Sequence, residues 1–161
     1  MAVATKFKYW LMKTEPDVFS IDDLKAAKDG STHWDGVRNY QARNFMRDQM
    51  QLDDRVLVYH SNANPSCVVG TARICKTAYP DFTAWDPQDP HFDPKSKADN
   101  PTWYMVDIQF ESKFSMPLSL AQLKQLPKLE GMELLRKGSR LSVQPVTKLQ
   151  FDTIFKLGQP T

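Results

Sequence analysis

The chain contains three signatures of a helix start, and strand-like sequence surrounds them. Each signature joins a hydroxyl side chain to an acid or amide three residues later: Ser20 with Asp23, Ser119 with Gln122, and Thr147 with Gln150. In such a capping box the two side chains satisfy backbone N–H groups that the first turn of a helix leaves free. We therefore expect helices to begin near residues 20, 119 and 147.

Strand-like runs lie before, between and after these helix starts. They are rich in β-branched and aromatic residues or alternate apolar with polar residues, and they occupy residues 7–12, 55–60, 67–76, 103–114 and 139–143. Sequential strands with helices inserted between them, and no steady alternation of the two, favour a mixed α+β domain over an all-parallel sheet. We expect about five to six mostly antiparallel strands in a small curved sheet or open barrel flanked by helices.

The length of the chain indicates one domain. Residues 1–161 can bury a single core without disulfides or metal ions. Cys67 and Cys75 are eight residues apart, too far to bond within one strand, so we expect them to be small core residues or free thiols. No apolar run approaches the roughly 18 residues that a membrane helix needs, and the N-terminus lacks the apolar stretch of a signal peptide. The expected location is the cytoplasm, or the nucleus if the source is eukaryotic.

Charge and proline are unevenly distributed. Residues 80–101 hold five Asp against two Lys and five of the eleven prolines, whereas residues 116–161 hold seven Lys or Arg against three acids. The net charge of +2 is too small to indicate nucleic-acid binding by itself, so the basic segment is either a positive face or ordinary solvated surface. The irregular segment 80–101 is either a cover over a functional site or a surface excursion pinned by its aromatic residues.

Residues 34–44, WDGVRNYQARN, gather basic, amide and aromatic side chains around one glycine. Gly36 permits the positive backbone angle of a tight turn, and Asn39 is placed to cap a helix whose apolar residues follow at helical spacing. Residues 38–40 would then lie at the mouth of the helix, where free N–H groups favour a phosphate or a carbonyl group. An ordinary capped amphipathic helix with solvated arginines is the alternative.

The sequence lacks the common signatures of metal, nucleotide and nucleophile chemistry. It has no CxxC or HExxH pair and no GxGxxG or GxxxxGK[ST] loop, so we expect no metal and no cofactor; the run HFD at 91–93 is a metal candidate. His60 precedes Ser61, and Asp35 or Asp107 could complete a triad, but adjacent residues of a strand point to opposite faces. We therefore expect no catalytic residues.

Four motifs in order resemble the EVE domain family, a family of small bacterial proteins and a eukaryotic nuclear protein. They are WLMKTEP at 10–16, WDGVRNYQARN at 34–44, VYHSN at 58–62 and SRLSVQPV at 139–146. The resemblance covers about residues 7–155 and implies a PUA-like fold, a curved β-barrel flanked by helices, related to YTH domains. It implies a non-catalytic reader of a modified base in nucleic acid, with a 5-substituted cytosine in DNA as the expected ligand.

A base can be inspected only after it leaves the stack, and the pocket must recover the few kcal/mol that this costs through stacking and edge contacts. The candidate walls are Trp34, Tyr40, Tyr59 and Trp103, with Trp10 as a further candidate. The candidates for the base edge and its 5-substituent are Arg38, Asn39, Ser61, Ser142, Val143, Gln144 and Pro145. The candidates for phosphate contacts are Lys13, Arg38, Arg43 and Arg140. Each has a structural alternative: core packing, a helix cap or a solvated charge.

Two other classes of function stay open at this point. One is an enzyme acting on a small molecule or nucleobase, with His60 or Asp35 as the base. The other is a protein-interaction domain whose pocket is vestigial. Within the binding class, a modified base in RNA is the alternative to DNA.

Overall fold

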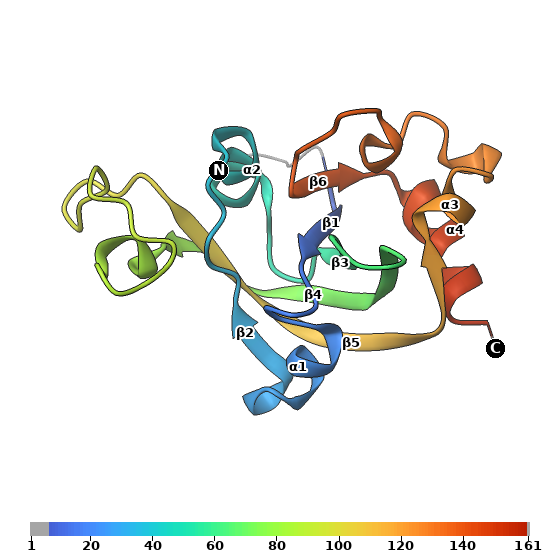
Figure 1. Ribbon diagram of the computed structural model, residues 1–161, viewed down its shortest axis with the longest axis horizontal. Helices are drawn as coiled ribbons and strands as arrows, with labels where there is room; N and C mark the ends of the chain where they lie inside the picture. The colour runs from blue at the N-terminus through green and yellow to red at the C-terminus, as the bar shows by residue number, and fades with distance from the viewer. Residues whose placement is uncertain (1–6, 161) are drawn as a thin grey trace.

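The computed structural model describes residues 7–160 and is organised by a six-stranded mixed sheet (Figure 1). The strands are β1 (Tyr9–Thr14), β2 (Ser31–His33), β3 (Arg55–His60), β4 (Cys67–Pro80), β5 (Tyr104–Ser119) and β6 (Val143–Val146). Their order across the sheet is β2-β5-β4-β3-β1-β6. The β1–β3 pair is parallel and the other four pairs are antiparallel, which confirms the α+β class and the mostly antiparallel sheet.

The sheet is open, with β2 and β6 at its two edges. Within residues 7–160 no pairing joins these edges, so the sheet does not close into the curved β-barrel that the family resemblance implies. Both edge strands are short, and Pro145 in β6 has no N–H group to donate to a further strand. The strand expected at 139–143 is also wrong, because the chain pairs with β1 only from Val143 onward. β2 was not predicted, since three residues carry no readable alternation.

The three predicted helix starts are confirmed. Ser20, Ser119 and Thr147 each cap a helix and each forms a complete capping box with the side chain three residues on: α1 (Ile21–Ala26), α3 (Leu120–Leu123) and α4 (Lys148–Gly158). Helix α2 (Tyr40–Asn44) continues into the π-helical turn η2 (Phe45–Gln49). The remaining short elements are the 3-10 turns η1 (Lys28–Gly30), η3 (Phe82–Trp85), η4 (Pro127–Leu129) and η5 (Glu133–Leu135). None of the described helices is long and apolar enough to cross a membrane.

Two apolar cores lie on the two faces of the sheet, as the alternation along β1 shows. Trp10 and Met12 are fully buried in one core together with Leu24 of α1. Leu11, between them in the strand, is buried in the other core together with Phe151 of α4. Because successive strand residues point to opposite faces, one apolar strand supports helices on both sides. The cysteines are free, as expected.

The connection from β4 to β5, residues 81–103, projects from the end of the molecule opposite α3 and α4 (Figure 1). We call it the proline-rich arm. Although it is long, it contains buried polar groups, including Asp81 and Ser96, and a buried ring, Trp103. Buried polar groups require hydrogen-bond partners, so the arm must be tied to the rest of the fold. These ties run to the segment between β2 and α2.

Candidate functional site

A cavity of about 520 Å³ lies where the end of β1, the turn after β2 and the tip of the proline-rich arm meet. Its lining comes from these three segments: Lys13, Thr14, Glu15, Val18, Phe19, Thr32, His33, Trp34, Asp35, Gly36 and His91. The volume falls within the range of about 300–1,000 Å³ that is typical of small-ligand sites. Two of the four sequence motifs, WLMKTEP and WDGVRNYQARN, therefore meet at one cavity.

Two aromatic side chains form the apolar wall of the cavity. The rings of Phe19 and Trp34 meet edge to face, with centroids 6.3 Å apart and an interplanar angle of 89°. Trp34 is only 8% exposed and its backbone N–H donates to Val106 O at 2.8 Å, so β5 fixes its position. The wall is rigid because it belongs to the core. Of the predicted aromatic walls, only Trp34 lines this cavity, and Phe19 was not predicted.

Polar groups from the end of β1 also line the cavity. The backbone N–H of Lys13 donates to Ser142 O at 2.9 Å, which ties the motif at 139–146 to the end of β1. Burial lowers the pKa of Lys13, although Glu133 works in the other direction. Glu15 Oε1 accepts from Asn62 Nδ2 at 3.3 Å, so the carboxylate is held at the rim. The site thus offers a cation and a carboxylate beside an aromatic wall.

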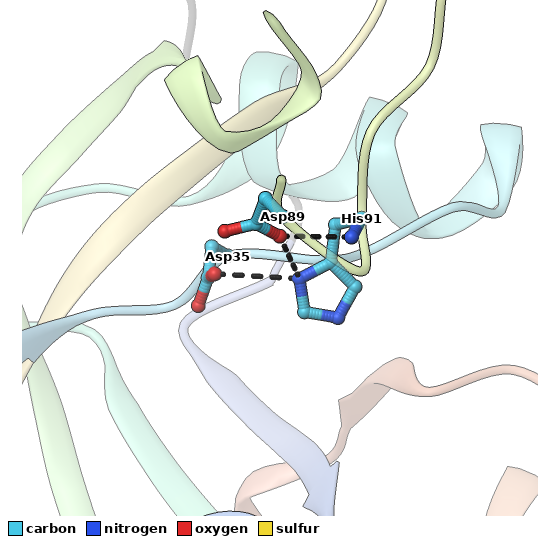
Figure 2. Close-up of side chains that lie close together, drawn as sticks. All are labelled: Asp35, Asp89 and His91. Atoms are coloured by element: carbon cyan, nitrogen blue, oxygen red, sulfur yellow. Dashed lines mark hydrogen bonds and ion pairs between the residues drawn. The ribbon is translucent and has the colours of Figure 1, made fainter. Parts of the chain in front are cut away.

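His91 is the contribution of the proline-rich arm to the cavity (Figure 2). Its ring rests against Gly36, where a Cβ atom would lie 2.5 Å from Nε2, and Gly36 has a φ of +84°. A side chain at residue 36 is therefore excluded both by backbone strain and by the imidazole. The His91 Nδ1 atom lies 3.4 Å from Asp35 Oδ2 and 3.3 Å from Asp89 Oδ1.

Asp35, Asp89 and His91 could hold a metal ion, because their donor atoms lie within 4.8 Å of one another. Asp93 does not join this group. Its Oδ2 accepts from Trp103 Nε1 at 2.7 Å, and this hydrogen bond is the main reason that the pKa of Asp93 is lowered. The run 91–93 therefore does not form a metal site by itself.

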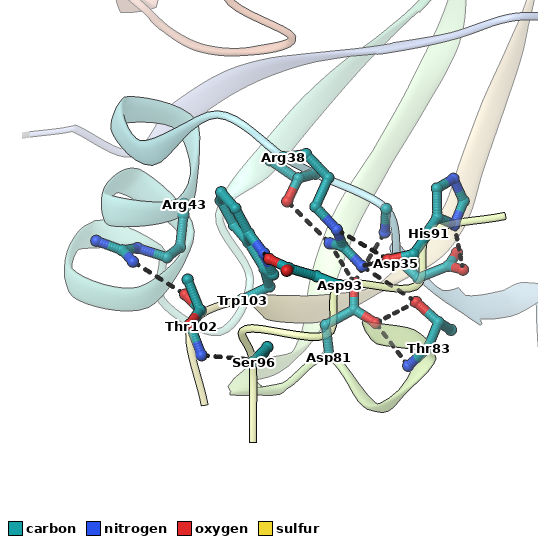
Figure 3. Close-up of polar contacts among 12 residues, drawn as sticks. Asp35, Arg38, Arg43, Asp81, Thr83, His91, Asp93, Ser96, Thr102 and Trp103 are labelled. Atoms are coloured by element: carbon teal, nitrogen blue, oxygen red, sulfur yellow. Dashed lines mark hydrogen bonds and ion pairs between the residues drawn. The ribbon is translucent and has the colours of Figure 1, made fainter. Parts of the chain in front are cut away.

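A buried ion pair ties the arm to the turn at Gly36 (Figure 3). Arg38 Nη1 lies 3.0 Å from Asp81 Oδ2, and the same carboxylate oxygen accepts from Gly36 N at 2.9 Å. Thr83 N donates to the other oxygen at 2.9 Å. Asp81 is fully buried, which alone would raise its pKa, but these hydrogen bonds outweigh burial and lower it. Arg38 also donates Nε and Nη2 to the His91 carbonyl oxygen, at 3.2 and 2.8 Å.

The contacts of Arg38 are therefore internal and hold the arm in place. Its partner Asp81 lies 43 residues away and was not predicted from the sequence. One local signal was available: Asp81 stands two residues before Thr83, the spacing at which an aspartate side chain turns back to a backbone N–H.

A second aromatic group lies outside the cavity, beside α2, and Figure 3 shows its Trp103 together with Arg43. Tyr40 stacks on Trp103 with ring centroids 5.0 Å apart and an angle of 28°. The guanidinium of Arg43 lies 4.9 Å from the Tyr40 ring centroid, and its Nη1 donates to Thr102 O at 2.9 Å. Tyr40 is 61% exposed whereas Trp103 is buried, so this platform presents one accessible ring with a cation beside it.

Four other predicted ligand residues are held inside the fold. Tyr59 is buried in the core on the α4 side of the sheet, where burial raises its pKa. Val143 is fully buried in the opposite core, and Trp10 donates Nε1 to Asp54 Oδ2 at 3.0 Å. Gln144 is fully buried and donates Nε2 to Leu141 O at 2.8 Å. None of the four lines the cavity.

The remaining candidates act through their backbones or lie on the surface. Ser61 N donates to Thr14 O at 2.9 Å and supports the end of β1. Pro145 pairs with Trp10 across β1 and β6. Asn39 is exposed, and its Oδ1 accepts from Ala42 N at 2.9 Å, so the predicted helix cap is confirmed. Arg140 is exposed.

The residues considered for a catalytic triad are not assembled. His60 Nε2 accepts from Ile21 N at 3.1 Å and so serves the start of α1, and burial lowers the pKa of this histidine. Asp107 accepts from the Tyr79 hydroxyl at 2.5 Å. Asp35 faces His91. His60, Asp107 and Asp35 are thus each engaged with a different partner.

Comparisons with known proteins agree with the resemblance read from the motifs. The EVE domain matches residues 8–157. Thymocyte nuclear protein 1 of Rattus norvegicus is 47% identical, over 92% of this chain and 73% of the rat protein. A crystal structure of a Pseudomonas syringae protein superposes with a TM-score of 0.88 at 48% identity, covering 92% of this chain and 98% of that one. Human THYN1 in complex with DNA containing 5-methylcytosine superposes with a TM-score of 0.88 at 43% identity, covering 95% and 98%.

Proposed function

The chain belongs to the EVE domain family, and from this membership and the cavity we propose that it is a non-catalytic module that binds a modified base in DNA, a 5-substituted cytosine. The observation that carries the proposal is the cavity of about 520 Å³, which has an aromatic wall and a polar rim. The relative that was crystallised with DNA containing 5-methylcytosine supports it. We propose that the protein acts where the cell holds its DNA, in the cytoplasm or, in a eukaryote, the nucleus.

The wall formed by Phe19 and Trp34 would receive the extruded base. Extrusion costs a few kcal/mol, and stacking on an aromatic side chain returns about 1–3 kcal/mol per base. A 5-methyl group offers no hydrogen bond and is discriminated by apolar contact. Val18, which also lines the cavity, supplies such a surface.

The polar rim matches the edge of a cytosine, which carries one amino group and two acceptors. The Lys13 ammonium can donate to an acceptor of the base, or to a phosphate at the mouth of the cavity. An acceptor in the lining of the cavity can accept from the amino group. Burial lowers the pKa of Lys13, and a ligand acceptor beside the ammonium would act in the opposite direction by favouring the charged form.

The platform of Tyr40, Trp103 and Arg43 would contact the strand outside the cavity. An exposed ring stacked on a buried one can hold a neighbouring base without reading its identity. Arg43 lies over the Tyr40 ring, and its guanidinium donates to Thr102 O and Asn44 Oδ1. The second hydrogens of Nη1 and Nη2 would donate to a phosphate. In this proposal Arg140 is a further phosphate contact, and such contacts position the nucleic acid without specifying sequence.

The direct test is binding of the purified protein to matched oligonucleotides at fixed salt, single- and double-stranded, in DNA and RNA. One position carries cytosine, 5-methylcytosine, 5-hydroxymethylcytosine or N6-methyladenine. We expect tightest binding to DNA with a 5-substituted cytosine. Equal or absent binding across the panel would overturn the proposal and favour a small-molecule ligand or a protein partner.

A substitution in the wall assigns the binding to the cavity. Phe19→Ala should weaken binding of the modified base about tenfold, since it removes one stacking surface. Leu149→Ala is the matched control, because Leu149 is an exposed apolar residue of α4 outside the cavity. If both variants remain folded and bind equally well, the ligand does not occupy this cavity.

A further inference from the structure

His91 is the side chain of the proline-rich arm that reaches the cavity, and its position is fixed from several directions. Arg38 holds its carbonyl oxygen with two hydrogen bonds, at 3.2 and 2.8 Å. Asp89 Oδ1 accepts its backbone N–H at 2.8 Å. The ring itself lies against the backbone of Gly36, where there is no space for a side chain. A residue held in this way presents its free atoms to the cavity in a defined direction.

The surroundings of Nδ1 determine which ring nitrogen carries the proton. Nδ1 is buried and has no hydrogen-bond partner among the described residues, and it lies 3.4 Å from Asp35 Oδ2 and 3.3 Å from Asp89 Oδ1. A lone pair on Nδ1 would face both negative oxygens, whereas an N–H group there is attracted to them. In the neutral imidazole the proton therefore resides on Nδ1, and Nε2 carries the lone pair.

The Nε2 atom lies on the side of the ring away from the two carboxylates (Figure 2). No group among residues 7–160 forms a hydrogen bond with it. In that part of the chain Nδ1 is a buried atom without a hydrogen-bond partner, whereas Nε2 is not buried. It is thus an acceptor, accessible at the cavity, that the protein itself does not use. The carboxylate of Glu15, which also lines the cavity, already accepts from Asn62.

We infer that His91 Nε2 accepts a hydrogen bond from the exocyclic amino group of the bound base, so that the site selects an amino-bearing base over a keto base. This inference rests on the proposed function. Cytosine presents an N4 amino group where thymine presents the O4 carbonyl, although both can carry the same 5-methyl group. With thymine in the cavity two acceptors would face each other, and neither would have a partner. Asp35 and Asp89 are positioning residues that keep the proton away from Nε2.

The experiment compares 5-methylcytosine with thymine, which differ at the amino edge but share the methyl group. Each base is placed opposite an abasic site, so that neither has base pairs to lose on extrusion. At one fixed pH, the native protein should bind 5-methylcytosine about tenfold more tightly than thymine. His91→Phe keeps a ring of similar shape against Gly36 but removes both nitrogens, and it should bind the two bases equally.

A measurement on the free protein tests the tautomer without any ligand. The ¹⁵N chemical shifts of the His91 ring should show the proton on Nδ1 in the native protein, with a chelator present to exclude a bound metal ion. In Asp35→Asn the Nδ1 tautomer should lose population, and the preference for 5-methylcytosine over thymine should fall with it. A merely structural role of Asp35 would leave the ring shifts unchanged.

The outcomes separate this inference from the proposed function. If the native protein binds both bases equally or prefers thymine, or if His91→Phe keeps the preference, the assignment to His91 is overturned while base binding stands. A proton on Nε2 in the free protein would overturn it as well. If no oligonucleotide of either kind binds, the proposed function fails.

Discussion

The start of α4 and the proline-rich arm are both held by hydrogen bonds to the backbone, but the partners lie at very different separations along the chain. Thr147 and Gln150 bond each other's backbone N–H groups across three residues. Arg38 bonds the carbonyl oxygen of His91 across 53 residues. The first contact forms with the helix itself, whereas the second forms only after the sheet has brought two segments together. The helix start is therefore a local property of the sequence, and the cavity beside the arm is a property of the whole fold.

The substitution expected to have the largest effect on stability and binding is Asp81→Ala. The substitution leaves Arg38 without its buried partner and removes the acceptor of the Gly36 and Thr83 N–H groups. Breaking a buried pair from one side costs about 3–5 kcal/mol, and the partial exposure of Arg38 favours the lower end of that range. The free energy of unfolding, from denaturant titration, should fall by about 3 kcal/mol, and binding of the modified base should be lost.

The matched control is Asp48→Ala. Asp48 also pairs with an arginine, Arg47, at 2.8 Å, but both side chains are well exposed. Exposed ion pairs contribute about 0–1 kcal/mol, so this control should leave both stability and binding nearly unchanged. If the two variants were destabilised equally, the arm would not depend on the pair formed by Asp81 and Arg38.

The same carboxylate predicts a dependence of stability on pH. Burial raises the pKa of Asp81, but hydrogen bonds from Thr83, Gly36 and Arg38 outweigh it and hold the pKa below the ordinary value of 3.8. A group whose pKa is lower in the folded state stabilises the fold above its unfolded pKa, and this contribution is lost as the pH falls through the folded pKa. The native protein should therefore lose stability below about pH 4 more steeply than Asp81→Ala. Equal acid profiles would contradict this assignment.

The elements that the sequence predicted are those whose causes lie within a few residues. The three helix starts, the Asn39 cap and β3 (Arg55–His60) follow from local hydrogen bonding and local apolar patterns. The edge strands were missed or displaced. β2 (Ser31–His33) exists because β5 pairs with it, and β6 includes a proline that only an edge position tolerates. Strand pairing at a sheet edge is decided by the partner strand, which a single run of residues does not reveal.

The site was predicted in part for the same reason. The WDGVRNYQARN segment does contribute Trp34, Asp35 and Gly36 to the cavity, and Lys13 comes from the first motif. Phe19 was not identified as a wall, and His91 was considered only as part of the metal candidate at 91–93, because it lies in an irregular segment without a period. Tyr59 was expected as a wall because it is aromatic, but strand alternation places it in the opposite core.

Gly36→Ala, at the point where the arm touches the turn, should destabilise the protein less than Asp81→Ala does. The new Cβ would lie 2.5 Å from His91 Nε2, at a residue whose φ is +84°. Gly138→Ala is the matched control, since Gly138 has a φ of +77° but nothing within 4 Å of the added atom. The backbone strain alone should cost about 1 kcal/mol in the control. Gly36→Ala should cost about 2 kcal/mol and should also weaken binding of the modified base, because His91 must move.

Equal losses in the two glycine variants would show that the contact with His91 does not constrain residue 36. Both unfolding free energies can be obtained by denaturant titration, and binding is measured with the same oligonucleotide. A loss of binding in Gly36→Ala without a matching loss in Gly138→Ala would assign the effect to the cavity.

The smallest effect is expected at the local contact, in Thr147→Ala. The substitution removes the hydroxyl that accepts from Gln150 N at 3.1 Å, and the loss of such a cap costs about 1 kcal/mol. Thr147→Ser keeps the hydroxyl and should retain nearly all of the stability. Because α4 packs on the core opposite to the cavity, the affinity of Thr147→Ala for the modified base should equal that of the native protein. The contrary outcome is that Thr147→Ala and Gly138→Ala weaken binding equally at a similar loss of stability, and that Gly36→Ala weakens it no further. Binding would then follow global stability, and the distinction between a local helix start and an assembled cavity would fail.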